Sequence, residues 1–287
     1  MIKNIRIFLL LPLFLMAAMA VQAQCKRALV FGLGEQEDKS WVKINGDKDV
    51  DYALEMLAAM GYTDVVTLKN AQATKAAMVD AFAALVARCQ KGDVVYVHYS
   101  GHGQMITDIN GDESLKWSGK HAMWDESWIP YDAYMLYGKN DDGSKHFVDD
   151  EVAVCLTAVR EAIGDNGELL VVVDACHSGD GTCGEEIAPL RGVGVKFNMP
   201  RNSSVQQVTE PVTEQWLTIS ACKPFQLNME MSQPQVGKLT YALYMLGAGV
   251  FDLESEELQQ RLTKFMEENK GLLPQTPVVS GAKKISK

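Results

Sequence analysis

The sequence predicts a single α/β domain built on a mostly parallel, doubly wound sheet. Five short apolar runs alternate with segments of helical periodicity, the pattern that helices crossing over a parallel sheet produce. The run 94–99 is apolar at consecutive positions, as expected for a strand buried on both faces. No Pro/Ser-rich linker and no internal repeat divides the chain, so we expect one domain over 24–287.

Apolar runs and capping signals define the elements in chain order. Strands are expected at 28–32, 64–68, 94–99, 169–173 and 216–220, and helices at 47–60, 74–88, 149–163 and 238–247. Gly61 follows the first helix as a C-cap glycine does. A further helix is expected at 255–269, where Leu258 and Leu262 share one face and Ser255 is the expected N-cap. A last strand is expected at 276–280.

Residues 1–23 have the composition of a signal peptide. Lys3 and Arg6 precede the apolar run 7–21, and Ala23 is the small residue expected at a cleavage point. An uncleaved anchor is the alternative, but this run is short for a bilayer and no later run is longer. We therefore expect export to the periplasm or exterior after cleavage near Ala23, and no membrane span in the mature chain.

The charge balance disfavours nucleic-acid binding, and the cysteine spacing disfavours a zinc site. Because 37 Asp and Glu outnumber 27 Lys and Arg, nucleic acid is not an expected partner. The six cysteines are candidates for disulfides in an oxidising compartment, and no pairing follows from their positions. Their spacing lacks the CxxC pairs of a zinc site, so no metal is expected.

Two glycine-flanked turns carry reactive side chains. YSGHG at 99–103 and DACHSG at 174–179 each follow a buried strand. Because ligand sites in parallel sheets form beyond the carboxyl ends of the strands, we expect His102 and Cys176 to meet there. The long segments 104–145 and 179–213 directly follow these turns and are expected to form the rims of the site.

A histidine and a thiol so placed indicate nucleophilic catalysis. The His102 imidazole can withdraw the proton of Cys176, and the main-chain N–H groups of Gly103 and Cys176 can hold the oxyanion of a tetrahedral intermediate. Alone, a cysteine is more often a small buried hydrophobe and a histidine more often structural. At two strand ends together, the pair favours catalysis. His177 is a rival base, and His98, inside its strand, is expected to be structural.

No third member of a catalytic triad is evident from the sequence. Asp174 lies two residues before Cys176 and therefore on the same face of the strand. A buried carboxylate there needs a partner, and a cationic side chain of the substrate would supply one. A structural capping role is the alternative for Asp174.

These motifs resemble those of the caspase-like cysteine peptidases of clan CD, in the metacaspase and bacterial caspase-domain branch of peptidase family C14. The QACxG signature of animal caspases is absent. Further matches follow in the family's order at 44–50, 125–132, 149–151, 220–223, 239–243 and 275–277. The resemblance implies a caspase-like three-layer α/β/α sandwich with a mostly parallel central sheet, and a cysteine-type endopeptidase acting on protein or peptide substrates.

The resemblance also implies roles for single residues. His102 is the implied general base and Cys176 the nucleophile that forms the acyl-enzyme. Asp174 and Ser100 match positions that line the S1 pocket of metacaspases, which implies cleavage after Arg or Lys. Asp132 matches a family position near the site. Metacaspases commonly carry an acidic residue where this chain has Phe225, so the expected basic specificity depends chiefly on Asp174.

No cofactor is expected, and nothing in the sequence supports calcium dependence, because no compact acidic loop has calcium-ligand spacing. A solvated face is the expected place of five acidic residues, namely Asp108, Asp112, Glu113, Asp141 and Asp142. Related peptidases are often activated by a cut in the loop after the nucleophile strand. In this chain that loop holds three basic residues that are candidates for self-cleavage, Arg191, Lys196 and Arg201.

Two other functions remain compatible with the sequence. One is a catalytically weak or inactive binding module that keeps the fold for partner recognition, an alternative that Phe225 favours and the retained His102 and Cys176 disfavour. The other is a thiol peptide ligase that uses the same pair and passes the acyl group to an amine.

Overall fold

The computed structural model describes residues 24–112, 123–176, 190–200, 203, 205, 215–223, 226–271 and 273–284. Several positions that carry a prediction lie outside the described residues, namely the expected leader 1–23, Glu113, His177, Arg201 and Phe225, and so does one of the six cysteines, Cys183. None of the helices in the described part of the chain is both long and apolar enough to cross a membrane.

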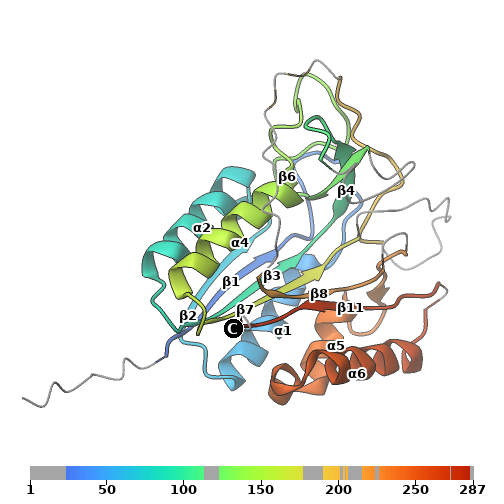
Figure 1. Ribbon diagram of the computed structural model, residues 1–287. Helices are drawn as coiled ribbons and strands as arrows, with labels where there is room; N and C mark the ends of the chain where they lie inside the picture. The colour runs from blue at the N-terminus through green and yellow to red at the C-terminus, as the bar shows by residue number, and fades with distance from the viewer. Residues whose placement is uncertain are drawn as a thin grey trace, which may run out of the picture.

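A six-stranded sheet forms the centre of the molecule (Figure 1). Its strands in spatial order are β11 (Val278–Gly281), β8 (Leu217–Ser220), β7 (Glu168–Asp174), β3 (Val94–Ser100), β1 (Lys26–Gly32) and β2 (Asp64–Lys69). All neighbouring pairs are parallel except β11 and β8. The mostly parallel sheet that the sequence predicts is therefore confirmed.

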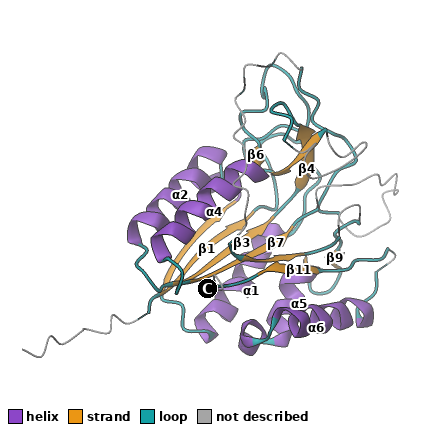
Figure 2. Cartoon of the chain, viewed as in Figure 1, coloured by secondary structure: helices purple, strands orange, loops and turns teal. Residues whose placement is uncertain are grey.

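Helices cover both faces of this sheet and make three layers (Figure 2). One face carries α2 (Lys75–Arg88) and α4 (Asp149–Ile163), and the other carries α1 (Gly46–Ala59), α5 (Lys238–Leu246) and α6 (Ser255–Glu268). Each interface is a separate apolar core, in which Phe82 and Leu156 pack on one side of the sheet and Leu57 and Leu243 on the other. The predicted α/β/α sandwich is therefore confirmed.

The helix ends partly follow the predicted caps. Gly61 follows α1 with a positive φ of 78°, and its N–H donates to Ala58, which ends the helix as the sequence predicts. Thr74 caps α2 by accepting a hydrogen bond from the amide of Ala77. The cap prediction for Ser255 was wrong, because Ser255 is the first residue of α6 and Glu254 occupies the cap position.

A second, smaller sheet lies beyond the carboxyl ends of the central strands (Figure 1). It is antiparallel and consists of β4 (Gly103–Thr107), β5 (Trp124–Trp128) and β6 (Phe147–Val148). No strand was expected between 104 and 145, so this sheet was missed. A hairpin of β9 (Glu230–Met231) and β10 (Val236–Gly237) leads into α5.

The register of the central strands determines where the reactive turns lie. Ser100 at the end of β3 is directly opposite Asp174 at the end of β7. His102 and Cys176 each follow two residues later, so both turns leave the sheet at neighbouring places.

Candidate active site

His102 lies in the short link between β3 and β4, and its imidazole is almost wholly buried. Its Nε2 lies 2.7 Å from the carbonyl oxygen of Val42. Since a carbonyl only accepts hydrogen bonds, Nε2 carries the proton, and the neutral ring has its lone pair on Nδ1. Nδ1 has no hydrogen-bond partner among the residues that the structure describes. The ring is therefore oriented through one nitrogen, while the other is available as a base.

The surroundings of His102 keep it uncharged. The Trp41 ring lies 5.1 Å from the imidazole, centroid to centroid. Burial lowers the pKa of His102 to about 4, which outweighs the hydrogen bond to Val42. At neutral pH the imidazole is thus uncharged, and Nδ1 carries no proton.

Cys176 follows β7, and its side chain is also buried, with 2% exposure. Its Sγ donates to the carbonyl oxygen of Gln226 at 2.9 Å, and Cys222 Sγ donates to the same oxygen at 3.3 Å. The neighbouring Cys176 thiol, and then burial, raises the pKa of Cys222 far above its usual value. Cys222 is therefore an inert thiol beside Cys176.

Two main-chain amides converge on one carbonyl oxygen between the two turns. The N–H groups of Gly103 and Cys176 both donate to the oxygen of Arg191, each at 3.1 Å. The backbones that carry His102 and Cys176 therefore lie on either side of a single peptide carbonyl. Two amides aimed at one oxygen are the geometry that an oxyanion hole requires.

The side chain of Arg191 is fully buried among acidic groups. We call its surroundings the acidic site, which consists of Asp49 on α1, Ser100 on β3, Asp174 on β7 and Glu230 on β9. Nη1 lies 2.6 Å from Asp49 and 3.5 Å from Asp174, and Nη2 lies 2.8 Å from Glu230. Nη1 also donates to the Ser100 hydroxyl and to the Asp174 carbonyl oxygen. One guanidinium thus forms ion pairs with three carboxylates.

Main-chain and side-chain donors hold these carboxylates in place. Asp49 accepts from the amide of Gly237 at 2.8 Å. Asp174 accepts from Asn228 at 2.7 Å, and from the amide and hydroxyl of Thr240 at the start of α5. Glu230 accepts from the amide of Asn45 at 2.6 Å. Because each acid has a donor other than Arg191, we infer that the fold itself positions the acidic site.

Burial and the neighbouring charges shift the pKa values of the acidic site and of Arg191 in opposite directions. Burial raises the pKa of Asp49 to about 6, although Arg191 opposes it. Burial also acts to raise the pKa of Asp174, but Arg191 and the hydrogen bonds from Asn228 and Thr240 outweigh it, so this pKa is lowered. Burial acts to lower the pKa of Arg191, but the three carboxylates raise it further, and the guanidinium stays charged. On acidification Asp49 takes a proton before Asp174 does.

The structure brings together most of the residues expected at the site, and two that were missed. Ser100 and Asp174 contact the same guanidinium. Asp49 lies in the segment 44–50 that carries the family resemblance, but its spacing did not indicate which way it points. Glu230 lies on a two-residue strand, for which the sequence gives no signal.

Other expected positions lie apart from this centre. Lys196 extends away, with its ammonium 4.5 Å from the centre of the Trp124 ring. Asp132 accepts from the amide of Lys75 at 2.9 Å and so stabilises the start of α2. His98 is buried between Tyr96 and Thr240, in agreement with a structural role.

The expected solvated face is only partly present. Asp141 is buried, accepts from the amides of Tyr134 and Gly143, and pairs with His146 at 3.4 Å, so that prediction was wrong for Asp141. Its carboxylate satisfies main-chain donors of the turn instead. Asp142 is exposed, as expected.

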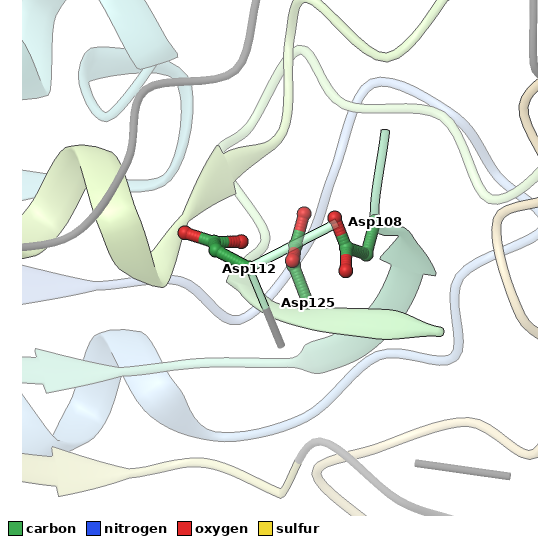
Figure 3. A group of neighbouring side chains, drawn as sticks. All are labelled: Asp108, Asp112 and Asp125. Atoms are coloured by element: carbon green, nitrogen blue, oxygen red, sulfur yellow. The ribbon is translucent and has the colours of Figure 1, made fainter. Parts of the chain in front are cut away.

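Asp108 and Asp112 also depart from the expected solvated face. Both are half-buried, and they meet Asp125 of β5, so that one carboxylate oxygen from each lies within 4.8 Å of the others (Figure 3). Carboxylate oxygens are the ligands that hard divalent cations prefer, so within the described residues this group has the chemistry to hold one. Sequence spacing missed it because Asp125 comes from the neighbouring strand.

Comparison with known proteins agrees with this geometry. The sequence profile described as "Metacaspase, peptidase C14 domain" matches residues 26–182, which include both reactive turns. The chain belongs to the metacaspase family. Within that family, Metacaspase-1 of Eremothecium gossypii is 33% identical over 106 residues, covering 37% of this chain and 20% of the relative. Metacaspase-1A of Aspergillus niger is 28% identical over 163 residues, covering 54% of this chain and 36% of the relative. The chain thus spans only a fifth to about a third of these metacaspases.

Solved structures show the same fold. Protein GSU0716 from Geobacter sulfurreducens has a TM-score of 0.66 at 22% identity, covering 91% of this chain and 95% of that one. Caspase-1 from Spodoptera frugiperda has a TM-score of 0.58 at 12% identity, covering 90% of this chain and 87% of that one. The predicted caspase-like fold is confirmed, and at these identities the likeness concerns the fold alone.

Proposed function

We propose that this metacaspase-family protein is a cysteine endopeptidase that cuts peptide bonds after arginine, and less readily after lysine. The observation that carries the proposal is an arginine bound at both ends. Its guanidinium lies in the acidic site, and its carbonyl oxygen lies between the amides of Gly103 and Cys176. A substrate arginine in the same position has its carbonyl carbon next to the Cys176 residue.

The chemistry follows from the groups around that carbonyl. Nδ1 of His102 takes the proton of the Cys176 thiol, and the thiolate attacks the carbonyl carbon. The amides of Gly103 and Cys176 stabilise the oxyanion, a contribution of about 3 kcal/mol per donor in other enzymes. His102 then protonates the leaving amine, and water hydrolyses the thioester. The Val42 carbonyl orients the imidazole, the task that a carboxylate performs in a Ser-His-Asp triad.

The acidic site explains the preference among basic residues. Asp49 and Glu230 bind different nitrogens of the guanidinium fork, which a lysine ammonium, a single point of charge, cannot do at once. A lysine side chain therefore pairs with fewer of the buried carboxylates. An aspartate side chain places a fourth negative charge there and is rejected.

The test is hydrolysis of fluorogenic peptides ending in Arg, Lys or Asp before the reporter group. We expect turnover in the order Arg, Lys and then no Asp, lost in Cys176→Ala and kept in Cys89→Ala, a half-buried thiol at the end of α2. Turnover of none of these peptides, with the fold intact, would contradict the proposal and favour a binding module. An added amine that captures the acyl group in place of water would indicate a ligase.

The proposal includes export. The composition of 1–23 supports removal of a leader near Ala23 and action in the periplasm or exterior. N-terminal sequencing of protein secreted by an expression host with a Sec pathway tests this, and we expect the mature chain to start at Gln24. A retained leader in the cytoplasmic fraction would contradict it.

A further inference from the structure

Three polar side chains of β3 lie on the face of the central sheet that α1 and α5 cover. Tyr96, His98 and Ser100 alternate along this strand, so they share one face, and all three are almost wholly buried. On β7 the residues opposite Tyr96 and His98 are apolar, and the residue opposite Ser100 is Asp174. Because a buried polar group lowers stability unless it is hydrogen-bonded, the tyrosine and the histidine need partners within this apolar layer.

Hydrogen bonds join these side chains into a series that ends at Asp174. The Tyr96 hydroxyl lies 2.8 Å from Nδ1 of His98, and Nε2 of His98 lies 3.2 Å from the hydroxyl oxygen of Thr240 on α5. The Thr240 hydroxyl in turn lies 2.7 Å from Oδ2 of Asp174. The series thus connects the apolar core beneath α5 with a carboxylate that pairs with the Arg191 guanidinium.

The ionised carboxylate of Asp174 determines the direction of every bond in the series. A carboxylate only accepts hydrogen bonds, so the Thr240 hydroxyl donates its one proton to Asp174. The Thr240 oxygen then accepts from His98, whose Nε2 carries the proton. Burial lowers the pKa of His98 to about 4, although Asp174 opposes the shift, so the ring is neutral at pH 7. Its Nδ1 therefore has no proton and accepts from the Tyr96 hydroxyl.

The two oxygens of Asp174 have different partners. Oδ2 accepts from both the hydroxyl and the amide of Thr240, at 2.7 and 2.8 Å. Oδ1 accepts from the side-chain amide of Asn228 at 2.7 Å and lies 3.5 Å from Nη1 of Arg191. Thr240 therefore fixes one edge of the carboxylate, and the other edge faces the basic side chain.

We propose that His98 is a positioning residue for a substrate arginine, and that it acts through Thr240 to hold Asp174 in the orientation that a guanidinium needs. The inference rests on the proposed function, and it adds a residue outside the acidic site to those that select the substrate. It also gives His98 a task that an apolar side chain in the same layer does not perform.

The series acts on the charge and the orientation of Asp174. Hydrogen bonds in series polarise one another, so a hydroxyl that accepts from His98 is a stronger donor to the carboxylate. A donor to a carboxylate stabilises its ionised form, which burial opposes. Without the His98 donor, the Thr240 hydroxyl is free to turn away. The loss is expected in the recognition of a positive charge, because neither Cys176 nor His102 contacts the series.

The test compares two fluorogenic peptides that differ only in the residue before the reporter group, which is arginine or its uncharged isostere citrulline. The citrulline peptide meets the same thiol and imidazole but gains nothing from the charge of Asp174. Both peptides compete with Arg191 for the acidic site, so its occupancy cancels in the ratio of their kcat/KM values. A general loss of catalytic power lowers both values equally and leaves this ratio unchanged.

Two substitutions at His98 separate its hydrogen-bond donor from its bulk. His98→Leu removes the donor, and we expect it to lower the Arg-to-citrulline ratio about tenfold, mainly through a higher KM for the Arg peptide. His98→Gln keeps an N–H donor near the position of Nε2, and its ratio is expected to stay within about threefold of the wild type. The matched control is His146→Leu, since His146 is equally buried but bonds to Gln104, and its ratio is expected to be unchanged.

Two further measurements do not depend on the His98 variants. Thr240→Val removes the next hydroxyl in the series with little change of shape and should lower the ratio at least as much as His98→Leu does. Nitrogen-15 NMR of histidine-labelled wild type, with circular dichroism to verify the fold of each variant, shows the tautomer of His98 without any substrate. We expect the proton on Nε2, and a proton on Nδ1 would overturn the inference.

The outcomes distinguish this inference from the proposed function. An Arg-to-citrulline ratio that is the same in the wild type, His98→Leu and Thr240→Val overturns the inference and leaves the function standing. An equal loss in His98→Gln and His98→Leu overturns it likewise, because bulk and not the donor would then matter. A folded wild type that hydrolyses neither peptide overturns both.

Discussion

Replacing Gly192 by alanine tests whether the chain cuts itself after Arg191, one of the three candidates for self-cleavage in this loop. The added β-carbon would lie 2.4 Å from the carbonyl oxygen of Cys176. Carbon and oxygen atoms approach to about 3.3 Å even in favourable contacts, so the chain must retreat by about 1 Å. The clash is with the backbone of Cys176, two residues beyond the end of β7, and we expect the 190–192 segment to be the part that moves.

That retreat has a calculable effect on cutting. The two hydrogen bonds to the Arg191 oxygen, 3.1 Å each, lengthen toward ~4 Å, beyond hydrogen-bond range. A misplacement of about 1 Å at a reacting centre costs roughly 100-fold in rate. We therefore expect Gly192→Ala to be cut after Arg191 about 100-fold more slowly than the wild type.

The assay is the fraction of intact chain against time, measured by mass spectrometry at one temperature and pH. Gly194→Ala is the control, because Gly194 lies in the same stretch of chain and is exposed. Equal rates of cutting for Gly192→Ala and the wild type would refute the reasoning, since the bond would then be cut in a conformation other than the one described.

Two further predictions concern buried titratable groups. Asp49→Asn removes one carboxylate from the acidic site and should lower kcat/KM for Arg peptides about 30-fold, or ~2 kcal/mol. Since the pKa of Asp49 is about 6, the wild-type kcat/KM should also fall from pH 7 to pH 5 through its protonation, and the Asn variant should lack that step. His102 has its pKa lowered from 6.5 to about 4 by burial, so the unfolded chain binds this proton first as the pH falls. The contribution of the neutral His102 ring to the free energy of unfolding is complete above about pH 6.5 and is lost towards pH 4. In urea unfolding, the free energy of unfolding of the wild type should therefore fall by ~3 kcal/mol more than that of His102→Gln between pH 7 and pH 4. A flat pH profile for wild-type kcat/KM would contradict the first prediction, and equal losses for the two proteins in urea the second.

Local sequence patterns were sufficient to predict the layers of the fold. The apolar run 94–99 is β3, and the helical patterns at 74–88 and 149–163 are α2 and α4. These elements were predictable because a buried face of a strand or helix leaves a pattern of apolar residues in the local sequence. The sheet of β4, β5 and β6 was missed since its strands are short, mixed in polarity and separated by long connections.

The candidate site, too, was predictable from local sequence only in part. That the turns of His102 and Cys176 lie close together was predictable, because each turn follows a buried strand of the same parallel sheet. Asp49 and Glu230 join them from a helix and a two-residue strand, and only the packed tertiary structure aligns these elements. The sequence offers Arg191, Lys196 and Arg201 equally as candidates for self-cleavage. Only the pairing of Leu190 with Met229 and of Gly192 with Gly103 places Arg191 between the two turns, and such long-range register leaves no trace in local sequence.

The hydrogen bond from His102 to Val42 has a consequence for how this protein can diverge. Residue 42 contributes only its main-chain oxygen, and its side chain is 61% exposed. No substitution at that position deletes the acceptor. Relatives are thus free to vary the side chain there, and with it the contacts offered to an approaching partner, while the imidazole keeps its orientation.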